Sequence, residues 1–307
     1  MVLILILIFV ITLPLYSARY YIRILTAVLM FVILAVSWAT FSGTTGYMSL
    51  APAAFFGTGI YTMALLQHHL PFPVVIIAGG LISFAFALLI GLVTLRLKGI
   101  YFAIFTFGLV VLMRELVHYA EALAGRHGRY LMEIDYSILL YTMLGLAVAT
   151  VVAIYFIRRS RLGLAMLSIG GNEEGAQHMG VNTTRVKVLS FAISASFMGL
   201  AGVVMAPLML YVNPSIAFSL NYSFIPILMA VFGGMGTLHG PIVGAVVFGY
   251  LERTLRSEFP QYFMLTFGII LVTFILFLPN GIAGLLPTLQ AKLGRVISKL
   301  QKGGQSE

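Results

Sequence analysis

The chain has 307 residues, of which 61% are hydrophobic and only 9% are charged, with a formal net charge of +9 and no cysteine. A soluble domain carries about 25% charged residues, and three long stretches here carry none, which excludes a soluble fold: 24–95, 188–251 and 259–291. The lack of cysteine excludes disulfides and thiol catalysis, and the basic residues lie between and after hydrophobic segments, as in membrane proteins, rather than in a nucleic-acid-binding patch.

The hydrophobic residues form ten segments that we expect to be transmembrane helices, because crossing a bilayer core about 30 Å thick takes roughly 20 apolar residues. The runs are continuous, whereas the strands of a membrane barrel alternate apolar and polar residues. The sequence therefore predicts an all-α, polytopic integral membrane protein with about ten spans. In chain order the segments are 1–16, 22–41, 50–67, 72–95, 99–118, 137–157, 188–212, 222–236, 240–252 and 261–279.

Four of the ten segments are short for a full crossing, and we expect them to tilt, break or re-enter. Irregular backbone inside a membrane is tolerated only where neighbouring protein or a water-filled cavity satisfies its hydrogen-bonding groups. The short segments are 1–16, 50–67, 222–236 and 240–252.

Basic clusters set the orientation, since cytoplasmic loops carry an excess of lysine and arginine. Such clusters lie in the turn at 96–98, in the loop at 158–187 and in the tail at 287–307. Ten crossings place all three clusters and both termini in the cytoplasm, although Arg19 and Arg23, at the start of the second segment, then lie outside. The alternative is nine crossings, with segment 50–67 re-entrant and the N-terminus outside; we prefer ten.

The chain divides into a transmembrane domain, residues 1–286, and a tail, residues 287–307. The tail alternates apolar residues with four cations, which is typical of a basic amphipathic helix lying on the inner leaflet. The first domain contains the cytoplasmic loop at 158–187, and no linker or low-complexity tract interrupts it.

The loop at 158–187 is the longest cytoplasmic connection. Its middle matches the spacing E-[A/G]-A-x3-G, which suits two short helices joined by a turn at the membrane surface. An amphipathic knob of this kind inserts into a groove on a soluble partner; the alternative is a solvated loop that merely joins two spans. The residues expected to couple to a partner are Asn172, Glu173, Glu174, Ala176 and Gly180.

Two glycine-rich runs, 46–61 and 233–241, are candidates for the translocation pathway. Small residues allow close helix packing, and glycine with proline interrupts a helix. The first run is either ordinary tight packing or a broken helix beside a pathway. The second is either a tight turn or a half-helix whose positive N-terminal end faces the pathway. The candidate residues are Gly46, Ser49, Pro52, Gly57, Gly233, Gly234, Gly236, Thr237 and Pro241.

The sequence offers no metal, cofactor or catalytic site. His68 and His69 are adjacent and do not share a helix face, and His239 stands alone, so we expect no metal ion. No nucleophile–base pair stands out, and no phosphate-binding G-x-x-x-x-G-K-[ST] is present. The neighbours Arg114 and Glu115 are better explained as an ion pair near a helix end than as a proton relay.

Five motifs in order along about 40–280 resemble the M-type permease subunit of bacterial branched-chain amino acid ABC transporters. Residues 46–61 match G-x-x-S-L-G-x-A-A-F-F-G-x-G-A-Y, and 95–103 match L-R-L-[RK]-G-I-Y-F-A. Residues 161–181 match R-x-G-x-A followed by N-E-x-x-A-x-x-x-G-[IV]. Residues 194–202 match S-A-x-x-x-G-x-A-G, and 233–245 match G-G-M-G-T-L-x-G-P-x-x-G-A.

The resemblance implies a subunit in the bacterial inner membrane that is not itself an enzyme. A binding protein would deliver the amino acid from outside, and this chain and a related second permease would form the pathway. Two ATPase subunits, which hold ATP and magnesium, would act through the loop at 158–187. The chain departs from the family pattern at several positions, which leaves urea or short amides as alternative substrates: Ala51, Pro52, Gly170, Gly171, Ile225 and Pro226.

Met235 favours the amino acid branch, because urea and short-amide permeases tend to carry arginine there. A stand-alone secondary carrier or channel is the alternative from a different class. Its ion coupling would need intramembrane ionisable residues, and the three charge-free stretches argue against it. An intramembrane enzyme lacks a nucleophile–base pair.

Overall fold

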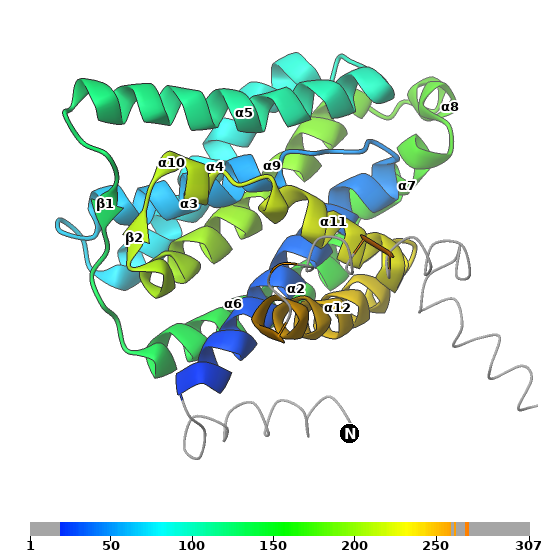
Figure 1. The fold of residues 1–307 in the computed structure, drawn as a ribbon. Coiled ribbons are helices and arrows are strands. Elements are labelled where there is room, and N and C mark those ends of the chain that lie inside the picture. Colours follow the sequence, from blue (N-terminus) through cyan, green and yellow to red (C-terminus); the bar gives the residue numbers. More distant parts are fainter. Residues whose placement is uncertain (1–18, 259–260, 262–267, 270–307) are drawn as a thin grey trace, which may run out of the picture.

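The computed structural model describes residues 19–258, 261, 268 and 269, which fold into a bundle of helices (Figure 1). Apart from two-residue strands β1 (Arg129–Tyr130) and β2 (Tyr211–Val212), the regular elements described are helical, so the all-α prediction is confirmed. The helices are α2 (Arg19–Thr45), α3 (Pro52–Leu66), α4 (Phe72–Thr94), α5 (Ile100–Leu123), α6 (Tyr136–Arg159), α7 (Arg161–Gly171), α8 (Glu173–His178), α9 (Thr183–Met205), η1 (Ala206–Met209), α10 (Pro214–Ala217), α11 (Asn221–Gly233) and α12 (His239–Glu258).

Eight of the ten predicted segments fall within the described residues, and each of them contains a helix. In the part of the chain that the structure describes, six spans are long and apolar enough to cross a membrane: α2, α4, α5, α6, α9 with η1, and α10 with α11. The prediction of a multi-pass helical membrane protein is therefore confirmed, whereas the number ten is not. Segment 1–16, most of segment 261–279 and the tail at 287–307 lie outside the described residues.

Helix α3 lies in the predicted segment 50–67 but is too short to be one of these spans. It has 15 residues, or about 22 Å of helix, which is shorter than a bilayer core of about 30 Å. A non-helical stretch, 46–51, precedes α3.

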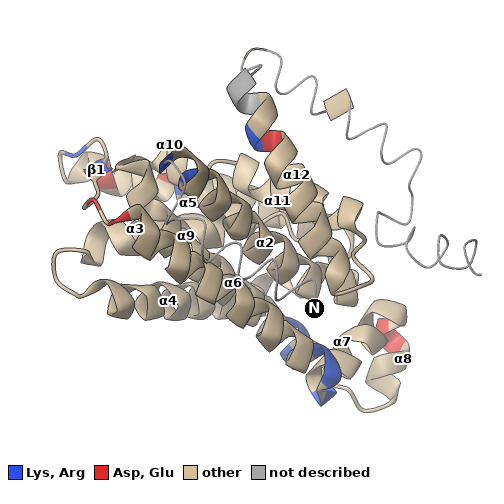
Figure 2. Cartoon of the chain, turned by 90° about the horizontal axis from the view of Figure 1, so that it is seen from below, with Lys and Arg blue, Asp and Glu red and all other residues tan. Residues whose placement is uncertain are grey.

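The described helices run between two ends of the molecule, which we call the β1 end and the α8 end. At the β1 end, β1 and β2 pair antiparallel, and the side chain of Gln67 donates to Tyr130 O (3.0 Å) and accepts from Met132 N (2.8 Å). At the α8 end, helices α7 and α8 stand out from the bundle (Figure 1). Charged residues gather mainly at these ends, while the helices between them are mostly uncharged (Figure 2).

Helix α9 packs in the core against α2, α3 and α4. The contacts require glycine, because a Cβ on Gly59 would overlap the carbonyl group of Gly199, and a Cβ on Gly202 would overlap that of Phe56. Gly57 likewise lies inside α3 and makes room for the ring of Phe218. It therefore serves close packing and does not itself break the helix.

Candidate coupling and pathway site

The first glycine-rich run contains a non-helical stretch between α2 and α3, residues 46–51, which we call the interruption. Helix α2 ends at Thr45, Gly46 follows with φ of 74°, and α3 begins at Pro52. A positive φ costs glycine little, because it has no Cβ. The side chain of Ser49 and all of Ala51 are buried, so non-helical backbone lies inside the bundle.

Side chains from two helices satisfy the middle of the interruption. The indole Nε1 of Trp38 donates to Ser49 O at 2.7 Å, and Leu50 N donates to the hydroxyl of Thr106 on α5 at 2.9 Å. Non-helical backbone at membrane depth needs such partners, since no water replaces them there. Residues 46–51 are therefore irregular backbone with satisfied polar groups, and a position beside a translocation pathway stays a prediction for this run.

Ser223, in the first turn of α11, joins that helix to α3. Its hydroxyl donates to Leu50 O at 2.9 Å and accepts from Ala53 N at 3.0 Å. The N-terminal turns of α3 and α11 therefore meet inside the protein, one on each side of the interruption.

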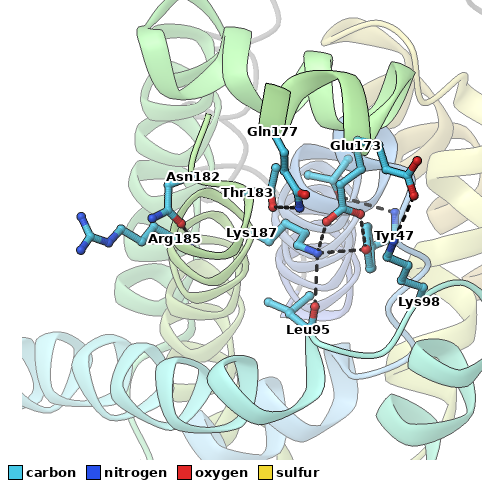
Figure 3. Close-up of polar contacts among 11 residues, drawn as sticks. Tyr47, Leu95, Lys98, Glu173, Gln177, Asn182, Thr183, Arg185 and Lys187 are labelled. Atoms are coloured by element: carbon cyan, nitrogen blue, oxygen red, sulfur yellow. Dashed lines mark hydrogen bonds and ion pairs between the residues drawn. The ribbon is translucent and has the colours of Figure 1, made fainter. Parts of the chain in front are cut away.

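The α8 end is tied to this interruption by one buried network (Figure 3). Lys187 Nζ donates to Glu173 Oε1 (2.6 Å), to Tyr47 OH (2.9 Å) and to Leu95 O (3.2 Å). Tyr47 OH donates in turn to Glu173 Oε2 at 2.5 Å. We call Tyr47, Glu173 and Lys187 the coupling network. It joins α8, α9, the interruption and the end of α4.

Lys187 is the buried centre of the coupling network, and its charge is paired with that of Glu173. Lys187 is only 3% exposed, and its ammonium lies 4.4 Å from the centre of the Tyr47 ring. Burial by itself raises the pKa of Glu173, but the hydrogen bonds from Lys187 and Tyr47 and the charge of Lys187 hold that pKa below its ordinary value. Glu173 is therefore ionised at neutral pH and paired with Lys187.

Two short helices occupy the predicted coupling loop. Asn172 lies between α7 and α8, and its side chain accepts from Gly175 N at 3.0 Å, which caps α8. Ala176 is buried, while Glu174 is exposed and lies 3.9 Å from Lys98. Gly180 has φ of 87° and no atom within 4 Å of where a Cβ would stand. The expected helix–turn–helix shape is confirmed, but α9 begins at Thr183, so the loop is shorter than predicted.

Helices α7 and α8, which we call the α7–α8 knob, expose both apolar and polar side chains. Leu164 and Leu167 on α7 and Met179 after α8 are exposed, and Met179 is 75% exposed. The exposed polar residues include Arg161 and Glu174. Large exposed apolar side chains beside charged ones fit an interaction surface.

The second glycine-rich run forms a turn between two helices. Gly233 ends α11, Gly234 follows with φ of 102°, and the hydroxyl of Thr237 accepts from Gly240 N at 3.0 Å near the start of α12. A Cβ on Gly233 would overlap Gly240 O, so the two helices meet backbone to backbone.

The remaining residues of that run fit the same description. Pro241 stands in the first turn of α12, and nothing lies near Gly236. Met235 packs against Gly43, near the end of α2. The expected helix start near Thr237 is confirmed, and the turn interpretation fits the geometry better than a break within one helix.

Sequence reasoning missed three of the residues that make this site. Lys187 was counted among loop cations, whereas the structure buries it in α9. Tyr47 and Ser223 were not singled out at all. One signal was available for Lys187: it follows the α9 cap, Asn182, by five residues and therefore lies inside an apolar helix rather than in the loop.

These features define a class: a multi-pass α-helical membrane protein with an interrupted helix in its core and a helical knob at one end. Residues 20–275 match the family described as branched-chain amino acid transport system / permease component. The chain belongs to this family, which confirms the resemblance drawn from the five motifs.

Curated relatives give the same result. The chain is 29% identical to the high-affinity branched-chain amino acid transport system permease protein LivM of Salmonella typhimurium, over 92% of this chain and 74% of that protein. It is 28% identical to LivM of Escherichia coli over the same shares. The corresponding permease protein LivH of Escherichia coli is 31% identical over 42% of each chain. No solved structure matches the chain.

Proposed function

We propose that this chain carries branched-chain amino acids across the bacterial inner membrane as one of two permease subunits of an ABC importer. Both LivM and LivH are named as permease proteins of branched-chain amino acid transport, and this chain is similar to both. The second permease subunit would be a LivH-like chain. A binding protein outside would deliver the substrate, and two ATPase subunits would supply the energy.

The observation that carries this proposal is the coupling network. An ATPase subunit that binds and displaces the α7–α8 knob would move Glu173. Glu173 is in turn held by short hydrogen bonds from Lys187 and Tyr47. Tyr47 belongs to the interruption between α2 and α3. Motion of the knob therefore reaches the irregular backbone in the core without passing through a flexible joint.

The pathway itself would run beside the interruption. Helices α3 and α9 are in backbone contact at Gly59 and Gly199, and α3 meets α11 at Ser223. We expect these three helices to shift as packed units. The glycines at 233–236 act in this proposal at the turn between α11 and α12, rather than as a hinge within one helix.

The proposal places the α8 end in the cytoplasm and the β1 end outside. Arg19, at the start of α2, lines one surface cavity with residues 133–137 of the β1 end, as ten crossings require. Both termini are then cytoplasmic. ATP hydrolysis belongs to the partner subunits, so this chain acts without a catalytic site of its own.

The test is leucine uptake and ATP hydrolysis by the reconstituted importer with a variant at Gly180. Gly180→Trp adds bulk where the chain itself leaves open space, so we expect uptake to fall at least tenfold while the complex still inserts. Gly180→Asn is the matched control, because asparagine tolerates a positive φ and stays small. Normal coupled uptake by Gly180→Trp would reject the docking role, and uptake that persists without ATPase subunits would favour a stand-alone carrier.

A further inference from the structure

A cavity of about 310 Å³ opens between α2, α10, α11 and α12, away from the coupling network. Its volume is within the range of about 300–1,000 Å³ that small-molecule sites occupy. Its wall is part apolar and part polar, which is unusual for a bundle so poor in charge. The residues that line it include Met30, Phe31, Ser219, Asn221, Ile225, Glu252 and Arg253.

The polar part of the wall contains one carboxylate and one guanidinium. Glu252 is 3% exposed and lies 13 positions after His239, or about 20 Å along α12 from the α8 end. A buried charge is costly unless hydrogen bonds or an opposite charge offset its desolvation. Glu252 and its neighbour Arg253 therefore bring both signs of charge to a single cavity.

The start of α11 adds a polar side chain. Asn221 is the first residue of that 13-residue helix and lines the cavity. The N–H groups of Tyr222, Ser223 and Phe224 already donate to Ser219 O and Leu220 O. The start of α11 therefore offers an anionic group the side-chain amide of Asn221, which is a hydrogen-bond donor, in addition to Arg253.

The apolar part of the wall comes from different helices. Met30 and Phe31 belong to α2, and Ile225 lies one turn into α11. These side chains favour an aliphatic group by burial of apolar surface. Opposite charges beside an apolar wall match the chemistry of a zwitterion with an aliphatic side chain.

We propose that this cavity is a substrate site in the membrane domain that binds an aliphatic α-amino acid. Glu252 accepts from the ammonium group, Arg253 and the side-chain amide of Asn221 hold the carboxylate, and Met30, Phe31 and Ile225 contact the side chain. The inference rests on the proposed function and deepens it, because the permease then selects its substrate in addition to the binding protein. A carboxylate accepts several hydrogen bonds, so Glu252 can bind the ligand alongside an existing partner.

The test measures binding of radiolabelled leucine to the complete importer in lipid nanodiscs, without binding protein. We expect saturable binding that Glu252→Gln weakens about 10- to 100-fold, as expected for a lost charged hydrogen bond. Two analogues identify the roles: 4-methylpentanoate lacks the ammonium group and 3-methylbutylamine lacks the carboxylate. In Glu252→Gln, 4-methylpentanoate should compete with leucine as well as it does in the wild type. In Arg253→Gln, the same should hold for 3-methylbutylamine.

Two further variants keep the test decisive. Glu115→Gln removes an exposed carboxylate from α5 and should leave leucine binding unchanged. Ile225→Trp fills the apolar part and should exclude leucine while alanine still binds, which a general loss of folding would not produce. Absence of leucine binding to the wild type, or equal leucine affinity in all variants, overturns the inference. Leucine uptake in the presence of the binding protein separates the two possible failures. If only the cavity site is wrong, this uptake persists; if the proposed function is wrong, this uptake is absent.

Discussion

The two ends of the molecule contain the same three kinds of side chain in different states of pairing. At the α8 end, Tyr47, Glu173 and Lys187 make three mutual hydrogen bonds of 2.5–2.9 Å. All three elements that carry them are thereby fixed to one another.

At the β1 end the set is Tyr61, Glu121 and Arg129. Glu121 is 4% exposed, yet Arg129 Nε lies 3.5 Å from its Oε1 outside hydrogen-bonding geometry. Within the described part of the chain, neither oxygen of Glu121 nor the hydroxyl of Tyr61 makes a hydrogen bond of good geometry, although the Tyr61 hydroxyl is near enough to the Glu121 carboxylate to interact with it. The loop that carries Arg129 is held instead through its backbone, by Gln67.

This difference in pairing predicts how each end of the molecule responds to force. A fully satisfied buried network holds its members in one arrangement, whereas unpaired buried groups are costly and gain by finding new partners. We therefore expect the α8 end to move as a unit with the interruption, and the β1 end to change its pairing at low cost.

The largest expected effect comes from Lys187→Met, which leaves the Glu173 carboxylate buried without its cation. Breaking a buried ion pair costs about 3–5 kcal/mol, so the purified subunit should unfold at a clearly lower temperature. The same change at the other end, Arg129→Met, should cost less because its pairing is already incomplete. A larger loss for Arg129→Met would invert the comparison.

Lys98→Ala is the control for that experiment. Lys98 lies 3.9 Å from Glu174 with both side chains largely exposed, and such surface pairs contribute about 0–1 kcal/mol. The melting temperature of Lys98→Ala should therefore stay near that of the wild type.

A smaller effect is expected from closing the contact between α7 and α2. A Cβ on Gly170 would overlap the carbonyl oxygen of Thr44, whereas a Cβ on Gly171 would meet nothing within 4 Å. Gly170→Ala should therefore destabilise the α8 end by about 1–3 kcal/mol, and it should reduce uptake per ATP hydrolysed. Gly171→Ala should match the wild type; equal defects in both variants would rule out this contact as the cause.

The meeting point of α3 and α11 should show an effect of similar or smaller size. Ser223→Ala removes the partner of Leu50 O and Ala53 N, and an orphaned buried group costs about 1–3 kcal/mol. Thr142→Val is the control, since Thr142 makes only an exposed bond within its own helix. A melting temperature for Ser223→Ala as high as that of Thr142→Val would show that other groups or water satisfy the interruption.

The smallest effect should be the pH dependence of the coupling network. Because the pKa of Glu173 is lowered, its stabilising effect is fully present above the unfolded value of about 4.3 and is lost as pH falls through the folded pKa. The difference in melting temperature between wild type and Glu173→Gln should stay constant from about pH 8 to pH 5. A difference that disappears between pH 7 and pH 5 would contradict the paired, ionised state.

Much of the fold could be predicted from the sequence because hydrophobic runs specify helices locally. The helix pair at 161–178 followed from spacing, and the break before Pro52 followed from glycine and proline. The partners of the break could not be predicted in the same way. Ser223 meets Leu50 across 173 positions, and such contacts depend on how helices pack rather than on any local pattern.

The charged residues show the same limit. A cation beside an apolar span is normally a marker of orientation, and Lys187 looks like one in the sequence. Only the folded chain brings Tyr47, 140 positions away, onto its ammonium group. The turn at 233–241 was left open between two interpretations because glycine spacing alone does not distinguish a turn from a broken helix.

The central claim is that ATPase subunits dock on the α8 end, and a cross-link tests it most directly. The chain contains no cysteine, so a single introduced cysteine gives one attachment point for a photoactivatable thiol reagent. Met179→Cys lies beside α8, and Tyr130→Cys lies at the β1 end and is 80% exposed. The account predicts that Met179→Cys cross-links to an ATPase subunit in the assembled importer and that Tyr130→Cys does not. An ATPase cross-link from Tyr130→Cys, with none from Met179→Cys, would contradict it.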